Sequence, residues 1–219
     1  STQAVLLEEK MGYKYVSWGR ITRDIIDDKL GSKSDKKIIL ENLKNDLPYP
    51  DGYIKEHMIR VITGELKKGA TSFVIDGFPK RVQEAQDCIK IIKELDLNLK
   101  CLVKIDCTEK SIFERVESRE YCKNCGKFYN AILKPKNEGI CDFDSGKLVK
   151  RVDDNSEMVK LRIDEYSREV NPAIELLSSI SEKVFSIDGD RDKLIIFSDI
   201  IENLKSDKLK LNTEIRRLA

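Results

Sequence analysis

The chain has 219 residues, and its 40 Lys and Arg nearly balance its 39 Asp and Glu, so the net charge is +1 with the single histidine neutral. Hydrophobic residues make up 40% and charged residues 36% of the sequence, which supplies a core but no membrane-spanning segment. With a net charge near zero, the chain also lacks the overall basic character of nucleic-acid-binding proteins. We therefore expect one folded domain, or one domain with a small insert, whose partners are neither membranes nor nucleic acids.

The first part of the chain predicts helices around one short strand. In chain order the expected elements are a helix at 5–9, a strand at 13–17, helices at 20–29 and 34–43, and a long amphipathic helix at 51–68. Pro48 and Pro50 end the helix at 34–43, and Gly69 ends the helix at 51–68.

The rest of the chain alternates strands with helices. A continuous apolar run at 72–76 ends in Asp76, which is typical of a buried parallel strand whose carboxyl end faces a ligand crevice. Further strands are expected at 99–106 and 184–188. Helices are expected at 81–95, at 109–119 with Thr108 as cap, from a capping box at 154–157 to an interruption at Pro172, and at 192–204, before a charged tail at 206–219 without an assigned role. This alternation predicts an α/β fold with a parallel sheet.

The six cysteines form two groups. Three sit singly among Ile, Leu and Val, where we expect buried thiols outside any disulfide: Cys88, Cys101 and Cys107. The other three combine a C-x2-C pair with a third cysteine and a nearby acid, a spacing that allows four ligands to meet at one tetrahedral ion, with zinc the expected metal. The alternative is unliganded thiols beside a solvated carboxylate. The predicted ligands are Cys122, Cys125, Cys141 and Asp144.

Residues 120–150 consist of short segments interrupted by Gly and Asn around these ligands. They hold too little apolar material for a core of their own, so we expect a small insert stabilised by the metal. Thiolate ligands suit a reducing compartment, and no secretory or transit peptide is visible. We expect a cytoplasmic protein.

Four stretches occur in an informative order. The expected strand runs into Asp-Gly-Phe-Pro-Lys at 76–80, a helix carries Glu-Arg-Val-Glu-Ser-Arg at 114–119, the metal insert follows, and Arg-Val-Asp-Asp at 151–154 precedes Arg162. In this order the chain resembles the adenylate kinase family, from Ser1 to about Leu204. The resemblance implies a P-loop kinase-like parallel sheet flanked by helices, with a small zinc-containing lid.

The same resemblance implies reversible transfer of the terminal phosphoryl group of ATP to AMP by a monomer, with Mg bound to ATP and Zn in the lid. It implies a core at 1–119 and 151–205, which includes a monophosphate-binding helical segment at about 17–46. The lid occupies 120–150, and the charged tail at 206–219 lies outside both.

Phosphoryl transfer places negative charge on every peripheral oxygen, so fixed cations are its main catalytic requirement. Arg115 and Arg119 lie four residues apart on one helix face at the lid entry, and Arg151 and Arg162 lie at its exit. We expect lid closure to bring these four onto the phosphates. Ordinary surface ion pairs are the alternative. By resemblance, Asp76 orients the water shell of magnesium, although it could instead only cap a turn.

The resemblance also divides the binding residues between two nucleotides. On the ATP side it implies Thr2, Arg115, Arg119, Phe128, Tyr129, Gly189 and Arg191, where Phe128 and Tyr129 could equally serve lid packing. On the AMP side it implies Trp18, Arg23, Gly77, Phe78, Lys80, Glu84, Arg151 and Arg162.

The chain departs from the family pattern near its start. The phosphate loop G-x-x-x-x-G-K-[ST] should end at about Thr2, and its glycines and lysine do not occur in the sequence. We expect either a chain without its natural N-terminus or a catalytically impaired nucleotide-binding relative. A zinc-ribbon nucleic-acid binder is a third interpretation, but it leaves the flanking arginines unexplained.

The monophosphate side departs as well. Trp18 and Arg20 replace a Thr and an Asp, and Lys80 replaces an arginine and so loses its bidentate fork. Glu84 takes the place of the glutamine that reads the AMP base, with Gln83 adjacent. A carboxylate suits the donors of guanine better than adenine, so GMP is an alternative acceptor, unless Glu84 turns away from the base.

Overall fold

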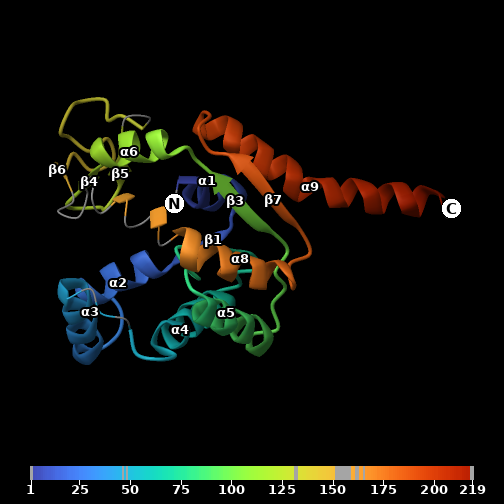
Figure 1. Cartoon of the computed structure of the whole chain (residues 1–219), viewed down its shortest axis with the longest axis horizontal. Helices are drawn as coiled ribbons and strands as arrows, with labels where there is room; N and C mark the ends of the chain where they lie inside the picture. The colour runs from blue at the N-terminus through green and yellow to red at the C-terminus, as the bar shows by residue number, and fades with distance from the viewer. Residues whose placement is uncertain are drawn as a thin grey trace. The chain divides into compact units, whose positions relative to one another are not determined.

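The computed structural model describes residues 2–45, 47, 49–130, 133–150, 159–160, 163–164 and 166–217, with side chains described as far as residue 205, Ser167 excepted. The chain divides into two compact units (Figure 1). Unit 1 comprises Ser1–Leu102 and Glu169–Phe185, and unit 2 comprises Val103–Arg168 and Ser186–Ala219. The chain crosses between the units within or next to regular elements rather than in long linkers.

Unit 1 is built on a pair of parallel strands. The register pairs Lys14 with Phe73 and Ser17 with Asp76, so the two strands end side by side. The elements of this unit are α1 (Thr2–Met11), β1 (Lys14–Ser17), α2 (Trp18–Ile26), α3 (Lys33–Asn45), α4 (Tyr53–Lys67), β2 (Phe73–Asp76), α5 (Val82–Glu94) and α8 (Asn171–Ser178). Both strands and all five expected helices up to α5 are therefore confirmed, with ends shifted by a few residues.

One apolar core joins these elements other than α1, which packs on β1 and β2, and α5 packs against both α4 and α8. The helices reach it through residues three or four apart, which lie on one helix face. On α2 these are Ile21 and Ile25, and on α4 they are Met58 and Ile62. Pro172 lies in the first turn of α8, where a missing backbone N–H costs nothing, so the proline begins this helix.

Unit 2 contains a second strand pair and a small antiparallel sheet. The pair joins β3 (Leu102–Asp106) to β7 (Val184–Asp188), strands that begin at the boundary with unit 1. The small sheet has the order β5-β4-β6, with β4 (Glu120–Cys122) central between β5 (Phe128–Tyr129) and β6 (Leu148–Lys150). The helices of this unit whose bounds lie within the described residues include α6 (Glu109–Glu117) and α9 (Lys193–Arg217), and a short π-helix, η1 (Tyr166–Val170), ends at the boundary.

Several expectations for this unit are confirmed. Thr108 caps α6, because its side-chain oxygen accepts a hydrogen bond of 3.3 Å from the amide of Ser111. The strand at 184–188 has the predicted bounds. The expected capping box at 154–157 lies outside the described residues.

Three expectations were wrong. The helix expected to end at 204 continues as α9 to Arg217, because no Gly or Pro interrupts that stretch. It extends away from the rest of unit 2 (Figure 1). β2 is half-buried rather than buried, since it pairs only with β1 in the described part of the chain. Cys101 and Cys107 are half-buried, whereas Cys88 is buried as expected. None of the described helices combines the length and apolar character needed to cross a bilayer.

Asp35 connects the start of α3 to α4. Its carboxylate accepts a 2.7 Å hydrogen bond from the amide of Ser32, whose hydroxyl accepts in turn from the amide of Asp35, which forms a capping box. The other carboxylate oxygen accepts from the Tyr53 hydroxyl at 3.1 Å and lies 3.3 Å from His57 Nε2. The hydrogen bonds from Ser32, supported by Tyr53, lower the pKa of Asp35 to about 2.

We predict that Asp35→Asn lowers the free energy of unfolding by about 1–3 kcal/mol near neutral pH, because several hydrogen bonds to the carboxylate are lost. The folded pKa lies below the ordinary value of 3.8, so this stabilisation is complete above about pH 4 and is lost as the pH falls toward 2. Urea titrations at several pH values measure it. A gap between wild type and variant that does not narrow with acid contradicts the prediction; Asp51→Asn, at an exposed turn, is the control.

Candidate functional site

Asp76 lies at the carboxyl end of β2, beside the end of β1. The Tyr15 hydroxyl donates a 2.8 Å hydrogen bond to its Oδ2. Ser17, its partner in the register, caps α2 by accepting a 3.1 Å hydrogen bond from the Arg20 amide. A carboxylate at the end of a parallel strand pair, next to a helix start, is placed where α/β proteins bind ligands.

The loop after Asp76 brings the next predicted residues together. Gly77 has φ +73°, which favours glycine, and Phe78 is buried. The amide of Lys80 donates a 2.7 Å hydrogen bond to the carboxylate of Glu84, which lies in the first turn of α5. Glu84, the expected base-reading residue, therefore holds its own loop in this conformation, and the Lys80 side chain is exposed.

Trp18 begins α2 and packs into an aromatic cluster. Its ring meets Tyr49 edge-on at 5.0 Å and Tyr53 edge-on at 6.0 Å between centroids. The predicted phosphate ligand Arg23 is exposed one turn later, with its guanidinium close to Gly19. Thr2 is exposed in the first turn of α1. The predicted monophosphate residues thus all belong to unit 1, apart from Arg151 and Arg162, which lie outside the described residues.

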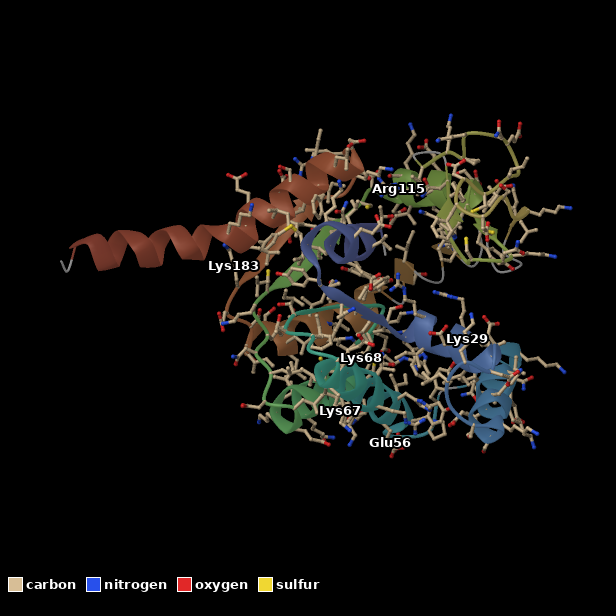
Figure 2. All side chains as sticks on the ribbon, turned by 180° about the vertical axis from the view of Figure 1, so that it is seen from behind. Lys29, Glu56, Lys67, Lys68, Arg115 and Lys183 are labelled. Atoms are coloured by element: carbon tan, nitrogen blue, oxygen red, sulfur yellow. The ribbon has the colours of Figure 1, made fainter. Side chains whose placement is uncertain are left out.

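In unit 2, Arg115 lies on α6 (Figure 2). It connects this helix to the loop after β7. Its Nη2 donates a 2.6 Å hydrogen bond to the carbonyl of Gly189 and lies 3.7 Å from Asp190. Its Nη1 lies 3.4 Å from Cys107 Sγ, and its buried Nε has no hydrogen-bond partner among the described residues. The structure therefore brings together two predicted ATP-side residues, Arg115 and Gly189.

Asp190 fixes the same loop against the start of α6. Its carboxylate accepts a 2.9 Å hydrogen bond from the Thr108 amide. Hydrogen bonds from Ser111 and Thr108 lower its pKa to about 2. Arg191 donates a 2.6 Å hydrogen bond to Asp199 on α9, so this predicted ATP-side residue is engaged within its own unit.

The four predicted metal ligands converge in the small sheet region of unit 2. Their ligand atoms all lie within 4.8 Å of one another, and the Sγ atoms of Cys125 and Cys141 are 3.6 Å apart. Tetrahedral zinc with Zn–S bonds of about 2.3 Å requires S–S distances of about 3.8 Å. The Cys122 thiol donates to Asp144 at 3.2 Å, which places the carboxylate among the thiols. This donor set can hold a tetrahedral metal ion.

Backbone amides support these ligands. The amide of Gly146 donates a 2.9 Å hydrogen bond to Asp144, and this bond with that from Cys122 lowers the pKa of Asp144 to about 2. Partial desolvation of its sulfur, with the Cys141 and Cys122 thiols beside it, raises the pKa of Cys125 above its ordinary value. A Cβ at Gly146 would lie 2.7 Å from Cys122 Sγ, so glycine is required there.

The remaining predicted lid residues lie beside this cluster. Tyr129 is buried, and its hydroxyl lies 3.4 Å from Cys141 Sγ and accepts a 2.8 Å hydrogen bond from the Asp142 amide. Phe128 is half-buried and packs near the Tyr121 ring, at 6.3 Å between centroids. Arg119 is half-buried between α6 and β4.

Three residues with structural roles are not among those predicted from the sequence. Tyr15 binds Asp76, and its place two residues before Ser17 puts it on the same sheet face as Asp76. Asp35, which connects α3 to α4, has a sequence signal, because Ser32 and Asp35 have capping-box spacing. The third is Asp190. No local signal marks Asp190, whose partners lie about 80 residues earlier in the chain.

The adenylate kinase family model matches residues 1–182. An adenylate kinase of Kosmotoga olearia is 32% identical over 208 residues, which cover 94% of this chain and 93% of that protein. Adenylate kinases of Thermosipho melanesiensis and Staphylococcus epidermidis are 32% and 31% identical, over 93% of this chain and 93% and 92% of their own lengths. The chain belongs to the adenylate kinase family, and its fold is the α/β P-loop kinase fold.

The close packing at Gly189 gives a test. A Cβ there would lie 2.5 Å from Cys107 Sγ and 2.6 Å from Ile105 Cγ2, so we predict that Gly189→Ala costs about 1–3 kcal/mol of stability. Gly64, in α4 near its C-terminal end, has open space where a Cβ would lie, and Gly64→Ala should instead add about 0.5–1 kcal/mol. Denaturant titrations measure both, and two variants of equal stability would show that the loop is not packed this way.

Proposed function

We propose that this protein transfers the terminal phosphoryl group of ATP to AMP, reversibly, as a phosphotransferase. The observation that carries the proposal is membership of the adenylate kinase family over most of the chain, with relatives named adenylate kinases. The placement of Asp76 at a strand end supports it, since the chemistry requires charge close to the phosphates.

Each proposed site residue then helps to balance the negative charge of the phosphates. Magnesium, when bound with ATP, supplies neutralising positive charge, and Asp76 orients the water around it. Arg115, held by the carbonyl of Gly189, contributes a fixed cation beside the ATP-side loop, so little reorganisation is needed during the reaction. Arg119, Arg151 and Arg162 are proposed to bind phosphate oxygens when the lid at 120–150 closes and excludes water.

On the acceptor side, we propose that Arg23 and Lys80 bind the monophosphate and that Trp18 lines the site. The aromatic cluster fixes Trp18, which supports a role in shaping the pocket. In the structure Glu84 accepts from the Lys80 amide, which supports its turning away from the base and so favours AMP over GMP. We also propose zinc in the Cys122, Cys125, Cys141 and Asp144 cluster, since its donors suit that metal.

We predict that the protein forms ADP from ATP and AMP faster than with GMP, UMP or CMP, and that Asp76→Asn lowers kcat at least about tenfold by weakening charge stabilisation. A coupled assay of ADP formation measures this. Asp27→Asn, at an exposed carboxylate that pairs with Lys29 in the described part of the chain, should match wild type. Absence of turnover with all four acceptors would instead support an impaired nucleotide-binding relative, and a preference for GMP would overturn the acceptor assignment.

We predict that the purified protein carries a single zinc ion per chain and that chelation or Cys125→Ser lowers its Tm. A loss of about 2 kcal/mol would lower the Tm by about 4–8 °C. Metal analysis and thermal unfolding measure the two effects. Cys101→Ser, away from the cluster, should keep its zinc. A metal-free protein with a Tm insensitive to chelator contradicts the assignment.

A further inference from the structure

Arg20 departs from the family pattern, and the structure shows what its side chain contacts. Its guanidinium carbon lies 3.9 Å from the centroid of the Tyr15 ring, which is cation–π geometry. Its Nη1 donates a 2.8 Å hydrogen bond to Glu8 on α1 and lies 3.4 Å from the carbonyl oxygen of Tyr15. The arginine therefore holds the side chain and the backbone of Tyr15 together.

Glu8 completes this arrangement from the other side. One carboxylate oxygen accepts from Arg20, and the other accepts a 3.1 Å hydrogen bond from the Tyr15 amide. The three residues come from α1, β1 and α2, all within unit 1. They are among the residues that line a cavity of about 270 Å³. Tyr15 is thus fixed at its amide, its carbonyl and its ring.

The fixed tyrosine reaches the carboxylate at the end of the neighbouring strand. In the parallel register Tyr15 pairs with Val74, so Asp76, two residues on, lies diagonally from it on the same sheet face. A tyrosine side chain can span that diagonal, and its hydroxyl donates to Oδ2 at 2.8 Å. This bond opposes rotation of the carboxylate, so Asp76 is held in one orientation before any ligand binds.

We propose that Tyr15 is a positioning residue for Asp76, and that Glu8 and Arg20 form the clamp that fixes Tyr15. The inference rests on the proposed function, because it assigns Asp76 to the magnesium side of the phosphoryl-transfer site. It gives the departure at Arg20 a role, because the arginine contacts Tyr15 and Glu8.

The test uses Tyr15→Phe, which removes only the hydroxyl. We expect kcat to fall about tenfold, the magnesium concentration for half-maximal rate to rise, and the KM for AMP to stay unchanged, since a hydrogen bond to a charged group is lost on the magnesium side alone. Tyr13→Phe removes the same atom from a neighbouring tyrosine and should match wild type. Arg20→Gln should lower kcat about threefold. When Arg20→Gln is combined with Tyr15→Phe, kcat should fall little further, because both substitutions act through the same contact of Tyr15 with Asp76.

A second readout does not depend on turnover. Binding of Mn²⁺ to the protein with ATP, followed by electron paramagnetic resonance, should weaken severalfold in Tyr15→Phe and remain unchanged in Tyr13→Phe. A Tyr15→Phe protein with wild-type kcat and wild-type Mn²⁺ affinity overturns the inference while leaving the proposed function intact. A Tyr15→Phe protein that loses thermal stability but keeps its kcat and its Mn²⁺ affinity overturns the inference in the same way. If the wild type shows no turnover, the proposed function fails, and the Mn²⁺ comparison alone decides whether Tyr15 positions Asp76.

Discussion

The parallel register of β1 and β2 is the constraint on which unit 1 depends. Because Ser17 pairs with Asp76, one strand end both starts α2 and lies beside the carboxylate of the site. The same register puts Tyr15 within reach of Asp76. A slip of one residue would move Tyr15 to the opposite sheet face and separate it from the carboxylate. Strand pairing, capping and site geometry are therefore set together.

Unit 2 meets a different constraint, since the core of its small sheet region consists, among the described residues, of four buried side chains: Cys122, Tyr129, Cys141 and Leu148. Two of these four are also candidate metal ligands. A metal ion there would connect the core directly to the backbone turns at Asn124, Phe143 and Gly146, whose amides already point at ligand atoms. In so small a body, metal binding and folding would then be one process.

Much of this could be predicted from the sequence, because its signals are local. Apolar periodicity predicts the helices of unit 1, and the C-x2-C spacing predicts the cluster that the structure brings together. Strand partners could not be predicted in this way: an apolar run shows that a strand exists but not that β3 joins β7. The bond from Arg115 to Gly189 spans 74 residues and likewise leaves no local pattern. In the sequence Arg20 stands out only as a departure from the family pattern, since its partner Glu8 comes close only when α1 and α2 both pack on β1.

The aromatic cluster around Trp18 has a spectroscopic consequence. Trp18 is the only tryptophan in the chain, and its ring touches Tyr49, Tyr53 and His57 at the junction of α2 and α4. Indole emission responds to the polarity and quenching groups of its immediate surroundings, so the tryptophan fluorescence of the protein reports on this one junction. Any ligand that changes how α2 packs on α4 would register as a change in emission without a label, while events confined to unit 2 would leave it silent.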